Sequence, residues 1–159
     1  MRFLNDELYP EQKIIVWAQN THIEKVNRNR MPFRLAQTDS VYSIGLFNYN
    51  GRGCFSFEQG FDGTPPEDMI YDYTPPSDSL RIEKIMVASG YDITFVDMKY
   101  QIKTNGNTWM FDKAKYAEWD GINVNEVNNI RGKWDALILI KQISTPKYLD
   151  FEYDYLTND

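Results

Sequence analysis

The chain has 159 residues, of which 42% are hydrophobic, and a formal net charge of −6. This length and composition favour one folded domain over a disordered chain, and the acidic balance disfavours non-specific binding to nucleic acid. The single cysteine, Cys54, excludes an intrachain disulfide scaffold, and we interpret it as a small core residue. Aromatic residues make up 15% of the chain, which is typical of strands and of binding surfaces.

Residues 1–40 are predicted to be an irregular N-terminal segment that packs on, or extends from, a β-sandwich domain spanning residues 41–159. An Ile-Ile-Val-Trp run within the segment favours a strand over residues 12–18. The alternative is a short helix that begins with Pro10 at its first position. Residues 27–32 are polar and indicate a loop.

The signals for β-structure begin at residue 41. Alternating apolar side chains predict a strand over residues 41–47, and Asn50-Gly51 is expected to turn the chain into a short strand over residues 54–57. Residues 61–79 contain two Pro-Pro pairs and are predicted to be a long loop. Six acidic residues and no basic residue occur over residues 58–78, so this loop region is acidic.

The second half of the chain continues the pattern of short strands and turns. Strands are predicted over residues 80–87 and 91–100, with a turn at Ser89-Gly90 between them. Asn105-Gly106-Asn107 indicates a hairpin turn that leads into a strand over residues 108–111.

The remaining residues are predicted to contain two loops and two strands. Residues 113–121 indicate either one helical turn or a loop, and residues 123–133 indicate an Asn- and Gly-rich loop. Residues 134–143 are apolar on both faces, which predicts a fully buried central strand that contains Ile138. Residues 149–155 alternate between apolar and acidic side chains and predict a strand with one acidic face.

These elements define an all-β fold class. About eight short strands with turn signals between them favour an antiparallel β-sandwich or a Greek-key barrel. Strands do not alternate with long helical patterns along the chain, so an α/β fold is not expected.

Two parts of the chain share a pattern with a period of about 45 residues, which is typical of stacked equivalent units. Each unit opens with an aromatic-bearing strand and closes with an apolar strand, at residues 81–87 in the first unit and 133–139 in the second. Phe95 and Tyr100 in the second unit, with Trp109 and Tyr116 further on, have the spacing of aromatic residues found in the βγ-crystallin motif. The chain therefore resembles the βγ-crystallins, a likeness that implies paired four-stranded Greek keys.

The chain also departs from the βγ-crystallin motif at positions that matter for calcium. In the first unit only Gly51, close to Tyr49, matches the glycine of the motif, and in the second unit Ile102 stands where that glycine is expected. The Ser-Ser pair of the calcium signature is replaced by Glu83-Lys84 and by Asp135-Ala136. The resemblance therefore does not imply a calcium site.

No catalytic or metal-binding set is visible in the sequence. His22 is the single histidine and lies in a polar context. Because the chain has one His and one Cys, these two residues cannot complete a tetrahedral zinc site. Phosphate-binding and EF-hand motifs do not occur. Acidic side chains are plentiful, but their spacing singles out no catalytic pair; the candidates are Asp92, Asp97, Glu118 and Asp120. The sequence therefore predicts no catalytic residue, no metal and no cofactor.

Two segments are candidates for a protein–protein interface. The stretch 25–34 carries four basic residues in an otherwise acidic chain, and the predicted strand 149–155 presents aromatic side chains at every second position. The candidate binding residues are Lys25, Arg28, Arg30, Arg34, Phe151, Tyr153 and Tyr155.

These observations predict a non-catalytic protein that is not an enzyme and acts by contact with another protein or its own copies, as an assembly component or an inhibitor; its composition would suit a phage protein. One alternative is a carbohydrate-binding β-sandwich in which Trp109, Trp119 or Trp134 stacks on sugar rings. A third is a hydrolase, which would need a pocket that holds an acid with a raised pKa. Neither a signal peptide nor a membrane-spanning run is visible, so the expected location is the cytoplasm or a particle assembled there, without a membrane or nucleic-acid partner.

Overall fold

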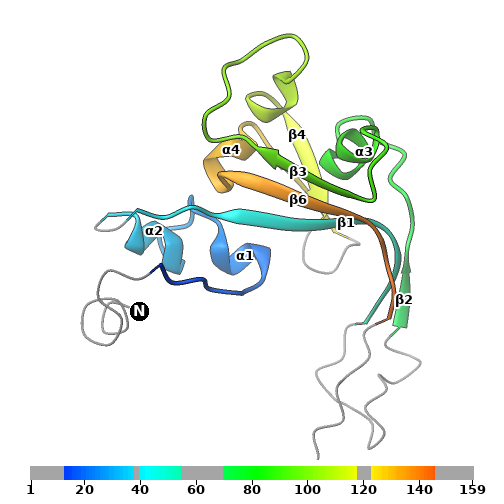
Figure 1. Ribbon diagram of the computed structural model, residues 1–159, viewed down its shortest axis with the longest axis horizontal. Coiled ribbons are helices and arrows are strands. Elements are labelled where there is room, and N and C mark those ends of the chain that lie inside the picture. Colours follow the sequence, from blue (N-terminus) through cyan, green and yellow to red (C-terminus); the bar gives the residue numbers. More distant parts are fainter. Residues whose placement is uncertain (1–12, 38–39, 55–69, 118–122, 146–159) are drawn as a thin grey trace, which may run out of the picture.

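The computed structural model describes residues 13–37, 40–54, 70–117 and 123–145 (Figure 1). Within these residues, short helices surround two sheets. The larger sheet has the strand order β2-β1-β6-β3, and the smaller sheet pairs β4 with β5. The strands are β1 (Ile44–Cys54), β2 (Ile70–Tyr73), β3 (Ile93–Asp97), β4 (Ala114–Ala117), β5 (Val124–Val127) and β6 (Ala136–Ile143).

The larger sheet is mixed. β1 runs parallel to β6, with Leu46 opposite Ile138, whereas β2 is antiparallel to β1 and β3 is antiparallel to β6. The helices are short and lie between or beside the strands. They are α1 (Asn20–Ile23), α2 (Met31–Leu35), α3 (Ile82–Val87), η3 (Thr108–Met110) and α4 (Ile130–Lys133).

One face of the larger sheet forms the core. Leu137 and Leu139 of β6 are fully buried there, next to Phe47 of β1. The Trp134 ring packs edge-on against the rings of Phe47 and Tyr116, with centroid separations of 5.4 and 5.3 Å. Such edge-to-face aromatic pairs stabilise a core beyond the area that they bury. Ile82 and Met86 of α3 complete this cluster.

The opposite face of the same sheet is open. Because side chains alternate across a strand, Leu46, Ile138 and Phe95 share this face, in register across β1, β6 and β3. Leu46 is 36% exposed, Phe95 56% and Ile93, two residues before Phe95, 66%. Sheets with parallel strands are normally covered on both faces. The described residues therefore leave the β3 side of this apolar face, at Ile93 and Phe95, without its usual covering.

The prediction of a strand-rich fold is confirmed, whereas the parallel pairing of β1 and β6 differs from the predicted all-antiparallel arrangement. The described strands form open sheets rather than a closed barrel. Residues 134–143 do supply the central strand, β6, but Ile138 is half-buried rather than fully buried, because its side chain lies on the open face. None of the helices in the described part of the chain has the length and apolarity needed to cross a membrane.

Three predictions in the first half of the domain were wrong. Residues 13–18 form neither strand nor helix, and Asn50-Gly51 does not turn the chain, because β1 continues through both residues to Cys54. Residues 82–87 form α3 instead of a strand. Buried Glu83 fixes that helix, since its carboxylate accepts hydrogen bonds from Arg81 Nε at 2.9 Å and from the backbone N–H of Ala117 at 2.6 Å.

The second half shows the same kind of error in short elements. β3 lies within the predicted strand 91–100, but residues 108–110 form the 3-10 helix η3. β4 lies where a helical turn or a loop was expected, and the predicted loop 123–133 contains β5 and α4. The first predicted repeat unit thus closes with a helix and the second with a strand. The predicted loop 61–79 contains β2 at residues 70–73, so that part of the prediction was wrong. Residues 61–69 and the predicted strand 149–155 lie outside the described residues.

Candidate functional site

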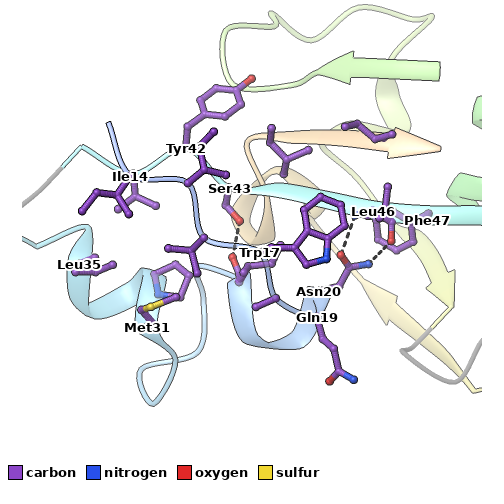
Figure 2. A pocket seen from close by; sticks show the side chains of 18 of the residues that line it. Ile14, Trp17, Gln19, Asn20, Met31, Leu35, Tyr42, Ser43, Leu46 and Phe47 are labelled. Atoms are coloured by element: carbon purple, nitrogen blue, oxygen red, sulfur yellow. Dashed lines mark hydrogen bonds between the residues drawn. The ribbon is translucent and has the colours of Figure 1, made fainter. Parts of the chain in front are cut away.

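A pocket of about 1080 Å³ lies between the N-terminal segment and the larger sheet (Figure 2). Residues 13–20 and helix α2 form one side of it, and β1 with Ile138 of β6 forms the other. The side chains that dominate the lining are apolar, among them Trp17, Met31 and Leu46. Pockets of this size that are mostly apolar are typical of small-molecule sites.

Hydrogen bonds fasten the N-terminal wall of the pocket to the sheet. The Asn20 side chain donates to the Leu46 carbonyl at 2.6 Å and accepts from the Leu46 N–H at 2.8 Å, so it pairs with the edge of β1 opposite β6 (Figure 2). The Ser43 hydroxyl donates to the Ile23 carbonyl at the end of α1. These contacts hold α1 beside β1 and fix the width of the pocket.

Polar groups are few in the pocket, and those present do not form a nucleophile–base pair. Among the described residues, its lining contains no Asp, Glu, His or Cys. Ser43 is buried, and its hydroxyl hydrogen is already donated to a backbone carbonyl. His22 lies on α1, is exposed and is not part of the lining. The described lining can therefore hold an apolar group but supplies no carboxylate, imidazole or thiol for catalysis; Lys13 is its one charged side chain.

Tyr42 stands at the rim of the pocket (Figure 2). Burial and a hydrogen bond to Asp97 raise the pKa of its phenol to about 12. The ammonium group of Lys99 lies 5.3 Å from the centroid of the Tyr42 ring. At neutral pH the Tyr42 hydroxyl is thus uncharged and remains a hydrogen-bond donor.

The predicted interface residues do not form one surface. Lys25 is half-buried, and its Nζ lies 2.6 Å from Asp135 Oδ1, an internal ion pair. Arg28 and Arg34 are exposed, and Arg34 Nε donates to the Arg28 carbonyl at 3.5 Å. The buried Nε of Arg30 has no hydrogen-bond partner among the described residues. The other three candidates, Phe151, Tyr153 and Tyr155, lie outside the described residues, so the interface stays a prediction.

The tryptophan platform predicted for carbohydrate binding is not formed by the described residues. Trp134 is 1% exposed and belongs to the core, and half-buried Trp109 packs against that core. Trp119 lies outside the described residues. Within the described ranges, no three His, Cys, Asp or Glu side chains group closely enough to hold a metal ion.

Sequence reasoning missed the pocket. Its walls come from residues 13–20, α2 and β1, which join through contacts between residues distant in sequence. One local signal was available: the Ile-Ile-Val-Trp run combines strongly apolar residues with a segment that is otherwise polar.

No family model matches the chain. It is 23% identical over 158 residues to a Bacillus subtilis (strain 168) protein named "Putative hydrolase YbfO", a match that covers 90% of this chain and 33% of the relative. Two solved structures share its fold. A succinoglycan biosynthesis protein has a TM-score of 0.59 and 18% identity, over 80% of this chain and 32% of that protein. A Bacillus cereus protein has a TM-score of 0.56 and 16% identity, over 82% and 33% respectively.

The chain spans about a third of the length of these proteins. The match to a protein named as a hydrolase overturns the prediction of a protein that acts by protein–protein contact or as a carbohydrate-binding module. The expectation that the chain is not an enzyme stays a prediction. The resemblance to βγ-crystallins stays a prediction.

Proposed function

We propose that the chain is part of a hydrolase and that its pocket binds the apolar part of the substrate. The similarity to YbfO over 90% of the chain carries this proposal. The chain spans 33% of that relative, so the complete activity would belong to a longer or assembled protein.

The composition of the pocket supports an apolar substrate group. The side chains of Leu46, Ile138 and Met31 line it, and the described lining itself contains no carboxylate. Transfer of an apolar group from water into such a lining is favourable by roughly 25 cal/mol per Å² of surface buried. Asn20 and Ser43 are already hydrogen-bonded, so they fix the shape of the pocket rather than recognise a charged ligand.

The catalytic groups of this proposed hydrolase would lie outside the described lining. A general base must come within hydrogen-bond reach of the proton that it removes. The lining contains no such acid or histidine. The pocket would therefore bind the substrate, and residues that lie at its rim would catalyse the hydrolysis.

Pocket filling tests the proposal. We would measure hydrolysis of p-nitrophenyl esters of increasing acyl length, with p-nitrophenyl phosphate and a p-nitrophenyl glucoside beside them. The enzyme would be YbfO in which the full 159-residue chain replaces the matched third, because the catalytic groups are expected in the rest of the longer protein. We expect turnover to rise with acyl length and Leu46→Trp to lower it about tenfold, a loss of roughly 1.4 kcal/mol of transition-state binding.

Leu80→Trp is the matched control, because Leu80 is 38% exposed, compared with 36% for Leu46, and lies outside the pocket lining. This control should leave turnover unchanged. No turnover above buffer with any substrate, or equal rates for the two variants, would contradict the proposal.

The β-sandwich arrangement and the cytoplasmic location stay predictions beside this function. A second sheet over the open face would complete a sandwich, whereas helices over that face would make a layered α/β unit.

A further inference from the structure

The segment Ile14–Trp17 shows the exposure pattern of a β-strand. Its side chains are 37%, 91%, 39% and 85% exposed in chain order, a repeat of two residues. An alternation of this kind is what an extended strand produces when one side of it faces the protein. The residue types, two Ile, a Val and a Trp, are those enriched in strands.

No strand among the described residues pairs with this segment. Among the described residues, the backbone N–H and C=O groups of residues 13–18 take part in no hydrogen bond with other backbone groups, and the first such bond along the chain is His22 N–H to the Gln19 carbonyl. An extended apolar segment with free backbone groups is a template for pairing with another strand.

The exposed side chains also lack a covering. Ile15 and Trp17 are the two most exposed residues of the segment, at 91% and 85%. Burial of such large apolar groups against another chain would be favourable, because it removes their surface from water. Ile93 and Phe95 on the open sheet face are also exposed apolar side chains, at 66% and 56%.

We propose that residues 14–17 form a β-strand by pairing with an apolar strand of polypeptide outside this chain, the counterpart of the two thirds of YbfO that the match leaves uncovered. The greater length of the related proteins is the reason for choosing this pairing partner. YbfO and both solved structures are about three times as long as the matched region, so each has chain available to supply a strand and a covering layer. A second copy is a poorer occupant, because two chains of net charge −6 repel each other. This inference does not depend on hydrolysis.

Amide hydrogen exchange tests the pairing. The full chain would be measured alone and after co-purification with YbfO from which the matched segment has been deleted. Alone, the amides of residues 14–17 should exchange at the rate of an unprotected peptide, since they have no backbone acceptor among the described residues. In the complex they should slow by about 100-fold or more, because exchange then requires opening of a strand pair.

Two variants at one position separate backbone pairing from side-chain contact. Val16→Pro removes a donor N–H and should abolish the complex, whereas Val16→Thr keeps the strand preference and the N–H and should retain it. Both variants should keep the melting temperature of the isolated chain, because Val16 makes no backbone hydrogen bond with the described residues. The inference is overturned if no complex forms, if residues 14–17 exchange equally fast within it, or if the chain protects them by self-association.

Discussion

Lys25 and Asp135, 110 residues apart in the sequence, form an ion pair with 2.6 Å between Nζ and Oδ1. The second oxygen of the same carboxylate accepts the Ser43 N–H at 2.8 Å, and the Asp135 side chain is 5% exposed. One buried carboxylate thus joins the segment after α1, the start of β1 and the start of β6. A buried charge is tolerated when it is paired and fully hydrogen-bonded, as it is here.

Asp135→Ala should therefore lower the free energy of unfolding by about 3 kcal/mol, because it strands the Ser43 N–H and the Lys25 ammonium group. Asp72→Ala is the control, since the Asp72–Arg52 pair at 3.2 Å is largely exposed, and we expect a change below about 1 kcal/mol. Urea unfolding followed by tryptophan fluorescence measures both. Similar losses for the two variants would show that burial does not set the strength of the Asp135 contacts.

Adjacent residues of β6 should respond very differently to a charge. Leu139→Asp places a carboxylate where the native side chain is fully buried in the core, and the several kcal/mol that this costs should leave the chain unfolded. Ile138→Asp places it on the open face, where Ile138 is half-buried, and the chain should remain folded. Far-UV circular dichroism and thermal melting distinguish the two. A folded Leu139→Asp variant, or an unfolded Ile138→Asp variant, would contradict the assignment of the two sheet faces.

The local sequence pattern correctly predicted strands β3 and β6. The apolar run of β6 and the alternation in β3 were visible because long-range packing agrees with strand propensity there. Residues 80–87 were mistaken for a strand because the run is short and rich in β-branched residues, although Ile82, Ile85 and Met86 follow the i, i+3, i+4 spacing of a helix. The partner that stabilises the helix, the Ala117 N–H bonded to Glu83, lies 34 residues away.

The pocket and the parallel pairing depend on contacts that no local pattern encodes. β1 and β6 are separated by most of the domain, and their pairing decides which face of each strand is buried. The Ile-Ile-Val-Trp run was interpreted as a strand because its residue types favour one. It stays unpaired among the described residues because no neighbouring strand is present, so its propensity alone does not produce a sheet.

Tyr42 should titrate at high pH. Its pKa is about 12, raised first by burial and then by the hydrogen bond to Asp97, from a usual value near 10. Because the folded pKa exceeds the unfolded one, the stabilisation from neutral Tyr42 is complete below pH 10 and is lost as the pH rises through 12. The tyrosinate absorbance of wild type minus Tyr42→Phe should therefore show a step near pH 12.

Asp97→Asn is the matched test of the causes of this shift, because it removes the negative charge of Asp97 and leaves burial in place. The step should move to lower pH but stay above 10. A step that remains near 12 would mean that Asp97 makes no contribution, and a step at 10 in the wild type would contradict the assigned surroundings of the phenol.

Gly51 provides the sharpest test of the path of β1. Its φ of +120° lies in the region that L-residues avoid, and a Cβ built there would stand 2.0 Å from the Ile143 carbonyl oxygen on the neighbouring strand. Gly51→Ala must therefore push β1 away from β6 and should lower the free energy of unfolding by at least about 2 kcal/mol. In a free Asn-Gly turn the same substitution would meet no neighbouring strand.

Gly106→Ala is the control, because a Cβ at Gly106 has no heavy atom within 4 Å, and its effect should stay below about 0.5 kcal/mol. Equal urea midpoints for the two variants would show that Gly51 lies in a turn and that β1 ends before it.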